Sequence, residues 1–179
     1  MRTKRSEKGF TLVEIAIVLV IIGLLLGALL KGQEMINSAK IKRVVSEANE
    51  LRAAALTYQD LYKYLPGDDL FPLTGVAGNG NGQIAGAEIG QFFVHLQGRN
   101  LISGSYAGTN YPTHAFGGNV SVAWATVQVK TTHWIQFGNM PGDKAQIIDT
   151  TYDDGNYQTG SIRGSGVYTG AAVTLSTEF

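Results

Sequence analysis

The stretch that decides the fold is Lys8-Gly9-Phe10-Thr11-Leu12-Val13-Glu14-Ile15, and an apolar run continues from it to Leu30. Among the 21 residues from Phe10 to Leu30, Glu14 is the only charged one. A helix of that length rises about 30 Å, which is the thickness of the hydrocarbon core of a bilayer. We therefore expect residues 10–30 to form a transmembrane helix with a buried acid near its N-terminal end.

The charges of the chain are balanced overall but unevenly distributed. Its 179 residues hold 14 basic and 14 acidic side chains, so the net charge does not favour nucleic acid as a partner. Residues 1–9, in contrast, hold four basic side chains and one acidic side chain. A basic flank before a single apolar segment predicts that the N-terminus stays in the cytoplasm and that the remainder crosses the membrane. The chain has no cysteine, so an exported domain would contain no disulfide.

Two simpler interpretations of the N-terminal stretch explain less. A cleaved secretory signal has a shorter apolar core, of about 7–15 residues, and a small-x-small cleavage site. Here the apolar run is longer, Glu14 interrupts it, and no such site follows it. A plain one-span anchor leaves Glu14 unexplained, because an ionised carboxylate in hydrocarbon costs several kcal/mol unless it has a partner.

The sequence Lys8-Gly9-Phe10-Thr11-Leu12-Val13-Glu14 resembles the processing signature of type IV prepilins and of the related pseudopilins of type II secretion. The resemblance implies that a prepilin peptidase cuts the Gly9–Phe10 bond, removes residues 1–9 as a leader and methylates the new amine of Phe10. It also implies a partner for Glu14, namely the cationic Phe10 amine of a neighbouring subunit. Such a pair would satisfy both charges in an apolar filament core and would penalise wrong axial registers.

Helical periodicity continues beyond the apolar run. Proline is absent from residues 10–65, and Pro66-Gly67 then ends the pattern. We expect one helix over residues 10–65, with a transmembrane and assembly half at 10–30 and an amphipathic half at 31–65 that packs on its own globular domain. The apolar stripe of the second half recurs at alternating spacings of three and four, at Ile41, Val44, Ala48, Leu51, Ala55, Tyr58, Tyr62 and Leu65.

Residues 66–179 shift towards Gly, Asn, Thr and Ser, which indicates a loop-rich globular domain. A helix followed by antiparallel strands predicts an α+β fold. The prepilin resemblance implies the same architecture, a long N-terminal helix packed on a small antiparallel sheet. We expect a helix over 87–102 that breaks near Gly98, a strand with a bulge over 120–129, a turn at 130–132, a strand at 133–137, a helical turn over 141–148, and late strands at 161–163, 166–169 and 172–175, the last at a sheet edge.

A first candidate calcium site follows part of the calcium-loop pattern. Asn79, Asn81 and Glu88 take ligand positions when Gly82 takes the turn position. The first ligand position would then be Ala77, which offers no side-chain oxygen. We favour the alternative that this segment is a glycine–asparagine turn before the helix expected at 87.

A second candidate calcium site is the acidic group Asp149, Asp153 and Asp154, with Asn156 beside it. The pseudopilin resemblance supports this hypothesis, because major pseudopilins hold calcium in their C-terminal loops. Asp-Gly and Asn in a polar stretch are also typical of hairpin turns, and we favour that interpretation. Calcium is the only cofactor that the sequence suggests.

No catalytic motif is recognisable in the sequence. His95, His114 and His133 show no metal-ligand spacing, and the chain has no nucleophile elbow and no phosphate loop. Its remaining basic residues are scattered, which does not predict binding of nucleic acid. We therefore expect a protein that is not an enzyme.

Together these features predict a structural subunit of a type IV pilus-like filament. Its expected partners are other copies of itself, a prepilin peptidase, and an assembly platform with its ATPase. The precursor would lie in the bacterial cytoplasmic membrane with its domain in the periplasm, and the mature subunit in an extracellular pilus. Two alternatives remain, a type II secretion pseudopilin in a periplasmic pseudopilus and a membrane-anchored periplasmic binding or adhesin domain. The sequence does not distinguish a major from a minor subunit.

Overall fold

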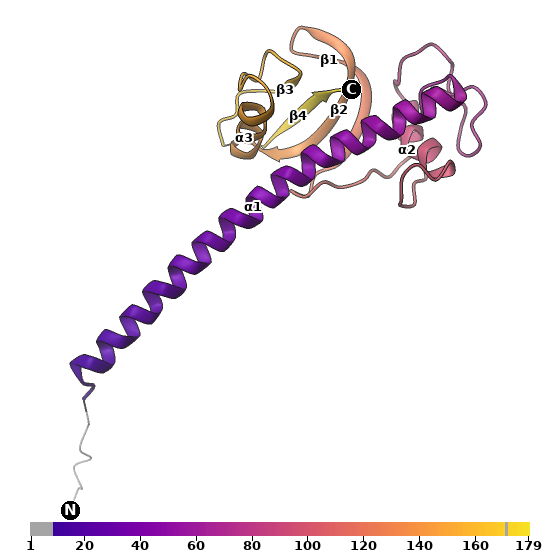
Figure 1. The fold of residues 1–179 in the computed structure, drawn as a ribbon. Helices are drawn as coiled ribbons and strands as arrows, with labels where there is room; N and C mark the ends of the chain where they lie inside the picture. The colour runs from indigo at the N-terminus through magenta and orange to yellow at the C-terminus, as the bar shows by residue number, and fades with distance from the viewer. Residues whose placement is uncertain (1–8, 171) are drawn as a thin grey trace, which may run out of the picture. The chain divides into compact units, whose positions relative to one another are not determined.

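The computed structural model describes residues 9–170 and 172–179. The chain divides into two compact units, Met1–Ala39 and Lys40–Phe179, and the first helix contributes residues to both. In chain order the elements are α1 (Leu12–Tyr62), α2 (Glu88–Gly98), β1 (Val120–Val127), β2 (Lys130–Pro141), α3 (Gly142–Tyr152), β3 (Ile162–Gly164) and β4 (Ala172–Glu178) (Figure 1).

In the first unit, the part of α1 up to Leu30 is apolar apart from Glu14 and is exposed on every side. Each residue from Gly9 to Leu30 is exposed, although most of them are large apolar residues. By length and composition α1 could cross a membrane. A helix that is apolar all round is stable only where lipid or other protein surrounds it. The segment 10–30 therefore needs an apolar environment that this chain does not itself supply within its described residues.

In the second unit, α1 buries one face, as the spacing of its apolar residues predicts. The helix ends at Tyr62 rather than at residue 65, because Lys63 adopts a left-handed backbone with φ of 65°. It begins at Leu12 rather than Phe10. The buried residues of this face are Ile41, Val44, Ala48, Leu51, Ala54, Ala55 and Tyr58.

The sheet is antiparallel throughout, in the order β1-β2-β4-β3. The expected turn at 130–132 is wrong, because Val127 pairs with Lys130 and the turn is therefore formed by Gln128 and Val129. The expected bulge in the strand over 120–129 is also wrong, since β1 and β2 pair in one continuous register. The irregularity lies instead in β2, between Phe137 and Met140, where it pairs with β4.

The late strands differ from the expected ones in two ways. Residues 166–169 form no strand, because a tight turn with a 2.8 Å hydrogen bond from Thr169 N to Val167 O occupies them. The strand expected at the edge, β4, lies inside the sheet between β2 and β3. Its alternate residues Val173 and Leu175 are buried, which suits a strand that packs on the core. The helices expected at 87–102 and 141–148 are present as α2 and α3.

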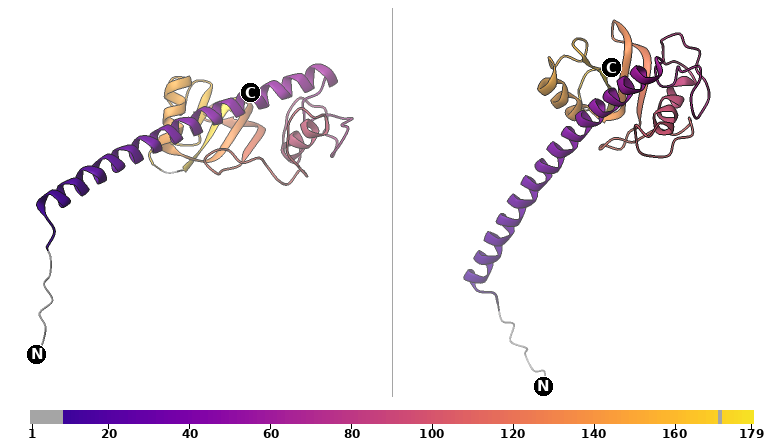
Figure 2. Two further views of the ribbon diagram at one scale, coloured as in Figure 1. Left: turned by 60° about the horizontal axis from the view of Figure 1, so that its bottom comes forward. Right: turned by 45° about the vertical axis from the view of Figure 1, so that its right-hand side comes forward.

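Within the second unit, α2 contacts β1 at one edge of the sheet, and α3 contacts β3 and β4 towards the other edge (Figures 1 and 2). One hydrophobic cluster joins these elements, and a buried core of this kind makes residues 40–179 a self-contained domain. The cluster includes Tyr58 of α1, Phe92, Phe93 and Leu96 of α2, Val122, Ile135, Phe137 and Leu175 of the sheet, and Ile148 of α3.

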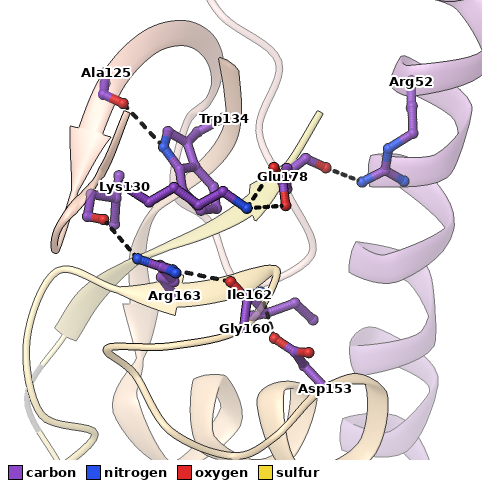
Figure 3. Close-up of polar contacts among 10 residues, drawn as sticks. Arg52, Ala125, Lys130, Trp134, Asp153, Gly160, Ile162, Arg163 and Glu178 are labelled. Carbon is purple, nitrogen blue, oxygen red and sulfur yellow. Dashed lines mark hydrogen bonds and ion pairs between the residues drawn. The ribbon is translucent and has the colours of Figure 1, made fainter. Parts of the chain in front are cut away.

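Polar contacts fasten β4 to its neighbours (Figure 3). The Arg52 guanidinium on α1 donates to the backbone carbonyl of Glu178 and, at 3.3 Å, to the hydroxyl of Thr177. The Glu178 carboxylate in turn pairs with the Lys130 ammonium of β2 at 2.7 Å. The end of the inner strand is thus tied both to the helix and to the neighbouring strand.

The buried Arg163 of β3 has no carboxylate partner among the described residues and binds other acceptors instead (Figure 3). Its guanidinium lies 5.8 Å from the ring centroid of Trp134 and donates to the carbonyls of Gly160 at 3.0 Å and Val127 at 3.5 Å. Trp134 donates its own ring N–H to Ala125 O at 3.1 Å. Backbone carbonyl oxygens and the ring of Trp134 therefore stabilise the positive charge of Arg163.

We expect Arg52→Ala to lower the free energy of unfolding of the domain by about 1–3 kcal/mol, because it removes charge-assisted hydrogen bonds to β4. Urea titration of the full chain in detergent micelles, followed by tryptophan fluorescence, measures this difference. Lys42→Ala is the matched control, since Lys42 is exposed on the same helix, and it should leave the unfolding midpoint unchanged. Equal midpoints for the two variants would contradict the role assigned to Arg52.

Candidate functional site

The start of α1 is built by a reciprocal contact between Thr11 and Glu14. The backbone N–H and the hydroxyl of Thr11 each donate to Glu14 Oε2 at 2.8 Å. The backbone N–H of Glu14 donates back to Thr11 Oγ1 at 3.2 Å. This arrangement is a capping box, which satisfies N–H groups that the first turn of a helix leaves without partners.

The sequence analysis assigned Glu14 a partner in a neighbouring subunit and missed this contact within the chain. The spacing Thr-x-x-Glu is a capping-box signature and could have revealed it. In residues 9–170 and 172–179, no donor contacts the other carboxylate oxygen, Oε1. One oxygen of Glu14 thus fixes the helix start, and the second is open to a further donor.

Gly9 and Phe10 lie before the helix and are exposed. A Cβ atom added to Gly9 would meet nothing within 4 Å, so the fold itself does not require a glycine there. Phe10 exposes 83% of its surface and therefore takes no part in the core of the chain. The leader expected at 1–9 lies outside the described residues except for Gly9.

The side chains of the first calcium candidate accept backbone N–H groups. Asn79 Oδ1 accepts from Asn81 N at 3.0 Å, and Asn81 Oδ1 accepts from Gln83 N at 2.8 Å. The buried Glu88 carboxylate accepts from Asn79 N and Ala85 N, each at 3.1 Å. These are the contacts of a hydrogen-bonded turn, the alternative that we favoured.

A buried acid that the sequence analysis did not single out organises the same loop. Asp68 is 1% exposed, and its carboxylate accepts from Asn81 N at 3.1 Å and from Gly82 N at 2.6 Å. Two backbone N–H groups of the loop therefore bind this carboxylate. The acidic sequence Gly67-Asp68-Asp69 directly after the helix could have drawn attention to Asp68. Its binding partner could not be predicted in this way, because Asn81 lies 13 residues further along the chain.

The neighbouring acid, Asp69, links the loop to α1. Its Oδ2 accepts a 2.6 Å hydrogen bond from the Tyr58 hydroxyl in the core. Burial, together with this hydrogen bond to Asp69, raises the pKa of Tyr58, so the phenol stays protonated and donates. The contact places residues 68–69 firmly against the helix.

His95 and His133 accept backbone hydrogen bonds inside the domain. His95 Nδ1 accepts from Gly67 N at 2.9 Å, so its Nε2 carries the proton and donates to Val76 O at 3.0 Å. His133 Nε2 accepts from Ile84 N at 3.2 Å. Burial lowers the pKa of both imidazoles, which keeps them neutral. The described structure does not bring His95, His114 and His133 together as ligands.

These histidines predict acid sensitivity of the domain. Their pKa is lower in the folded state than the ordinary value of about 6.5, so neutral imidazole stabilises the fold above that pH. The stabilisation is lost as the pH falls through the folded pKa. Carbon-detected NMR titration of the imidazoles should show His95 and His133 titrating below their values in urea. Titration of both at or above the urea value would contradict this assignment.

The second calcium candidate does form a cluster. Asp149, Asp153 and Asp154 each offer a carboxylate oxygen, and these oxygens lie within 4.8 Å of one another. Asp149 is buried, and its carboxylate accepts from the Tyr168 hydroxyl at 2.7 Å and from Gly155 N at 3.0 Å. Burial raises the pKa of Asp149.

The other two acids of the cluster also accept hydrogen bonds. Asp153 Oδ2 accepts from Ile162 N at 2.8 Å. Asp154 accepts from the Thr159 hydroxyl at 2.6 Å and from Asn156 N at 2.9 Å, and these bonds lower its pKa. All three carboxylates therefore fasten the loop over 153–162, and calcium at this position stays a hypothesis.

We expect calcium to leave the melting temperature of the domain unchanged, because N–H and O–H donors already occupy the carboxylates that would bind it. Calorimetry of the full chain in chelator and in millimolar calcium measures this. Asp154→Asn is a suitable control, since an amide oxygen still accepts from Asn156 N. A calcium-dependent rise in melting temperature that Asp154→Asn abolishes would show instead that the cluster binds the ion.

Comparison with known proteins agrees with this geometry. A family model described as the prokaryotic N-terminal methylation motif matches residues 4–30, which include Gly9, Phe10 and Glu14. The resemblance to prepilins is therefore confirmed over this segment. In this chain the motif leads into a long helix that packs on a small antiparallel sheet, which is a pilin-like arrangement.

Beyond the motif, the chain is similar to the type IV major fimbrial protein FimA of Dichelobacter nodosus. The two are 28% identical over 148 residues, which cover 82% of this chain and 72% of the relative. No solved structure matches the chain.

Proposed function

We propose that the chain is a structural subunit of a type IV pilus-like filament and that it assembles through its N-terminal helix. The observation that carries the proposal is the contrast between its two parts. Residues 10–30 of α1 are apolar and exposed throughout, whereas residues 40–179 enclose a core of their own. A folded domain joined to an uncovered apolar helix suits a protein whose helix is covered by lipid before assembly and by other copies afterwards.

The motif supports processing by a prepilin peptidase between Gly9 and Phe10. Cleavage there would create an amine on Phe10, one residue before the capping residue Thr11. A Cβ atom at Gly9 would meet nothing within 4 Å, so the fold does not compete with a role of this glycine in recognition by the peptidase. We propose methylation of the Phe10 amine on the same motif.

The capping box suggests how Glu14 is accommodated at each stage. Thr11 satisfies Oε2 within the chain, which lowers the cost of placing the acid in lipid. Oε1 is then available to the cationic Phe10 amine of a neighbouring copy. On assembly the Glu14 carboxylate, which has one of its oxygens bonded within the chain, would gain a partner for the other oxygen. Because only one axial register brings the two charges together, this pairing would favour that register.

A role without catalysis fits the described residues. His95, His114 and His133 bond to backbone groups, and none contacts a hydroxyl that could act as a nucleophile. The subunit would act through binding to copies of itself, with an assembly platform and ATPase supplying the work of extraction from the bacterial cytoplasmic membrane. The fimbrial relative favours an extracellular pilus over a periplasmic pseudopilus.

The test combines the N-terminus of the mature protein with filament assembly. Mass spectrometry should find a chain that begins with methylated Phe10. Glu14→Val should be processed in the same way yet form at least about tenfold fewer filaments, since a lost buried charge pair of 1.4 kcal/mol or more changes an equilibrium by that factor. Electron microscopy of shed filaments measures the number.

Glu34→Val is the matched control, because Glu34 is an exposed acid on the same helix and pairs with Lys31 one turn away. It should assemble normally. An unprocessed N-terminus would remove the processing proposal, and equal filament numbers for the Glu14 and Glu34 variants would remove the pairing. Subunits that remain diffuse in the membrane would indicate the anchored binding domain instead.

A further inference from the structure

The domain contains three pairs of neighbouring residues that are chemically labile. They are Asn79-Gly80, Asn81-Gly82 and Asp154-Gly155, and no other asparagine or aspartate in the sequence precedes a glycine. The first residue of each pair is exposed, so water reaches its side chain. A glycine has no side chain to shield its backbone nitrogen, which makes these pairs the places where the chain is most open to spontaneous covalent change.

The reaction of such a pair needs only water. The backbone nitrogen of the glycine bonds to the side-chain carbonyl carbon of the preceding residue, and its proton departs with the leaving group, which is ammonia from asparagine and water from aspartic acid. Water then opens the five-membered imide at either carbonyl and leaves aspartate or isoaspartate. Asparagine thereby becomes an acid, and isoaspartate lengthens the backbone by one carbon atom, so either product disturbs an ordered loop.

The three pairs share one turn geometry. A side-chain oxygen of the first residue accepts from the backbone N–H two residues further on. Asn81 N donates to Asn79 at 3.0 Å, Gln83 N to Asn81 at 2.8 Å, and Asn156 N to Asp154 at 2.9 Å. The glycine in each turn has a positive φ, of 69°, 78° and 76° in chain order. Because only glycine adopts such an angle at little cost, these turns favour the residue pairs that are labile.

A buried aspartate holds the backbone N–H of each of these glycines. Gly82 N donates to Asp68 Oδ2 at 2.6 Å, and Gly80 N donates to the backbone carbonyl of the same residue at 3.1 Å. In the other loop, Gly155 N donates to Asp149 Oδ1 at 3.0 Å. Asp68 exposes 1% of its surface and Asp149 exposes none. The same arrangement therefore occurs in two loops that are far apart in the sequence.

A glycine nitrogen that donates to a fixed acceptor is not free to attack. Its lone pair becomes available only when the peptide group twists and gives up its proton, and this movement breaks the hydrogen bond. Hydrogen bonds to a carboxylate are about twice as strong as neutral ones, so the effect is largest at Gly82 and Gly155. We expect the reaction at these two glycines to be slowed at least about tenfold, which corresponds to 1.4 kcal/mol of barrier.

We propose that the three pairs are sites of spontaneous deamidation or isomerisation, and that buried aspartates hold this modification back in the folded domain. Asp68 protects Asn79 and Asn81 by binding the N–H groups of the glycines that follow them. Asp149 protects Asp154 in the same way. The inference goes beyond the proposed filament function and does not rest on it, because it concerns the covalent lifetime of the domain itself.

The unaltered chain provides the first test. The full chain is incubated at neutral pH in detergent micelles, with and without urea, and peptides are analysed by mass spectrometry with fragmentation that distinguishes isoaspartate from aspartate. Conversion at Asn81 and at Asp154 should be at least about tenfold slower in the folded chain than in urea. Equal rates in the two conditions would overturn the proposal.

Substitution of Asp68 separates the held N–H from the general order of the loop. Asp68→Ala should speed conversion at Asn81 at least about tenfold, because Gly82 N loses its acceptor. Conversion at Asn79 should rise less, since the backbone carbonyl that binds the next glycine is still present.

Glu88→Ala is the matched control for this loop. The buried Glu88 carboxylate accepts from Asn79 N and Ala85 N, and within the described residues it accepts from no glycine. The variant loosens the same loop but should leave the rate at Asn81 near that of the unaltered chain. Equal acceleration by Asp68→Ala and Glu88→Ala would overturn the proposal, and so would slower conversion in Asp68→Ala, which would show that the carboxylate assists the attack.

The second loop repeats the test and controls for unfolding. Asp149→Ala should speed isomerisation of Asp154 and leave conversion at Asn81 unchanged, whereas Asp68→Ala should do the reverse. Acceleration in both loops by each variant would show that unfolding, and not release of one nitrogen, sets the rate, and would overturn the proposal. None of these measurements needs a filament, so the inference and the proposed function can fail independently.

Discussion

The structure depends on one constraint, which is that the N-terminal part of α1 has no polar face. Water cannot solvate a helix that is apolar on every side, so residues 10–30 must be covered by lipid or by other helices. The single acid in this segment is tolerated because Thr11 binds it through two hydrogen bonds. The folded domain, with its own core, can then form without using this part of the helix.

The sequence predicted features that depend on neighbouring residues better than features that depend on contacts between distant parts of the chain. The helix and its buried face follow from local periodicity, so Ile41, Val44 and Ala48 were placed correctly. The hairpin turn at Gln128 and Val129 was missed because Val129 is apolar and looked like a strand residue, although it is almost fully exposed. The place of β4 was missed because neighbours in a sheet are set by pairing over long separations, which local patterns do not report.

The same difference between local and distant contacts holds for the N-terminal site and for the loops. Gly9, Phe10 and Glu14 lie in a contiguous motif, which a sequence pattern can detect, whereas the capping partner of Glu14 was overlooked although its spacing was visible. Asp68 and Asp69 were not recognised as the anchors of the loop after α1, since their partners lie elsewhere in the chain or on the helix. Short acidic clusters in this domain fasten loops through N–H and O–H donors, which composition alone cannot distinguish from metal ligation.

The place of β4 inside the sheet has a consequence for the order of folding. The strand at 172–178 separates β2 from β3 and is fixed to α1 through Arg52, yet it is synthesised after every element it joins. A chain that is made in sequence order can pair β1 with β2 early, but β3 has no strand to pair with until β4 has been made. The sheet is therefore completed only by the last strand of the chain.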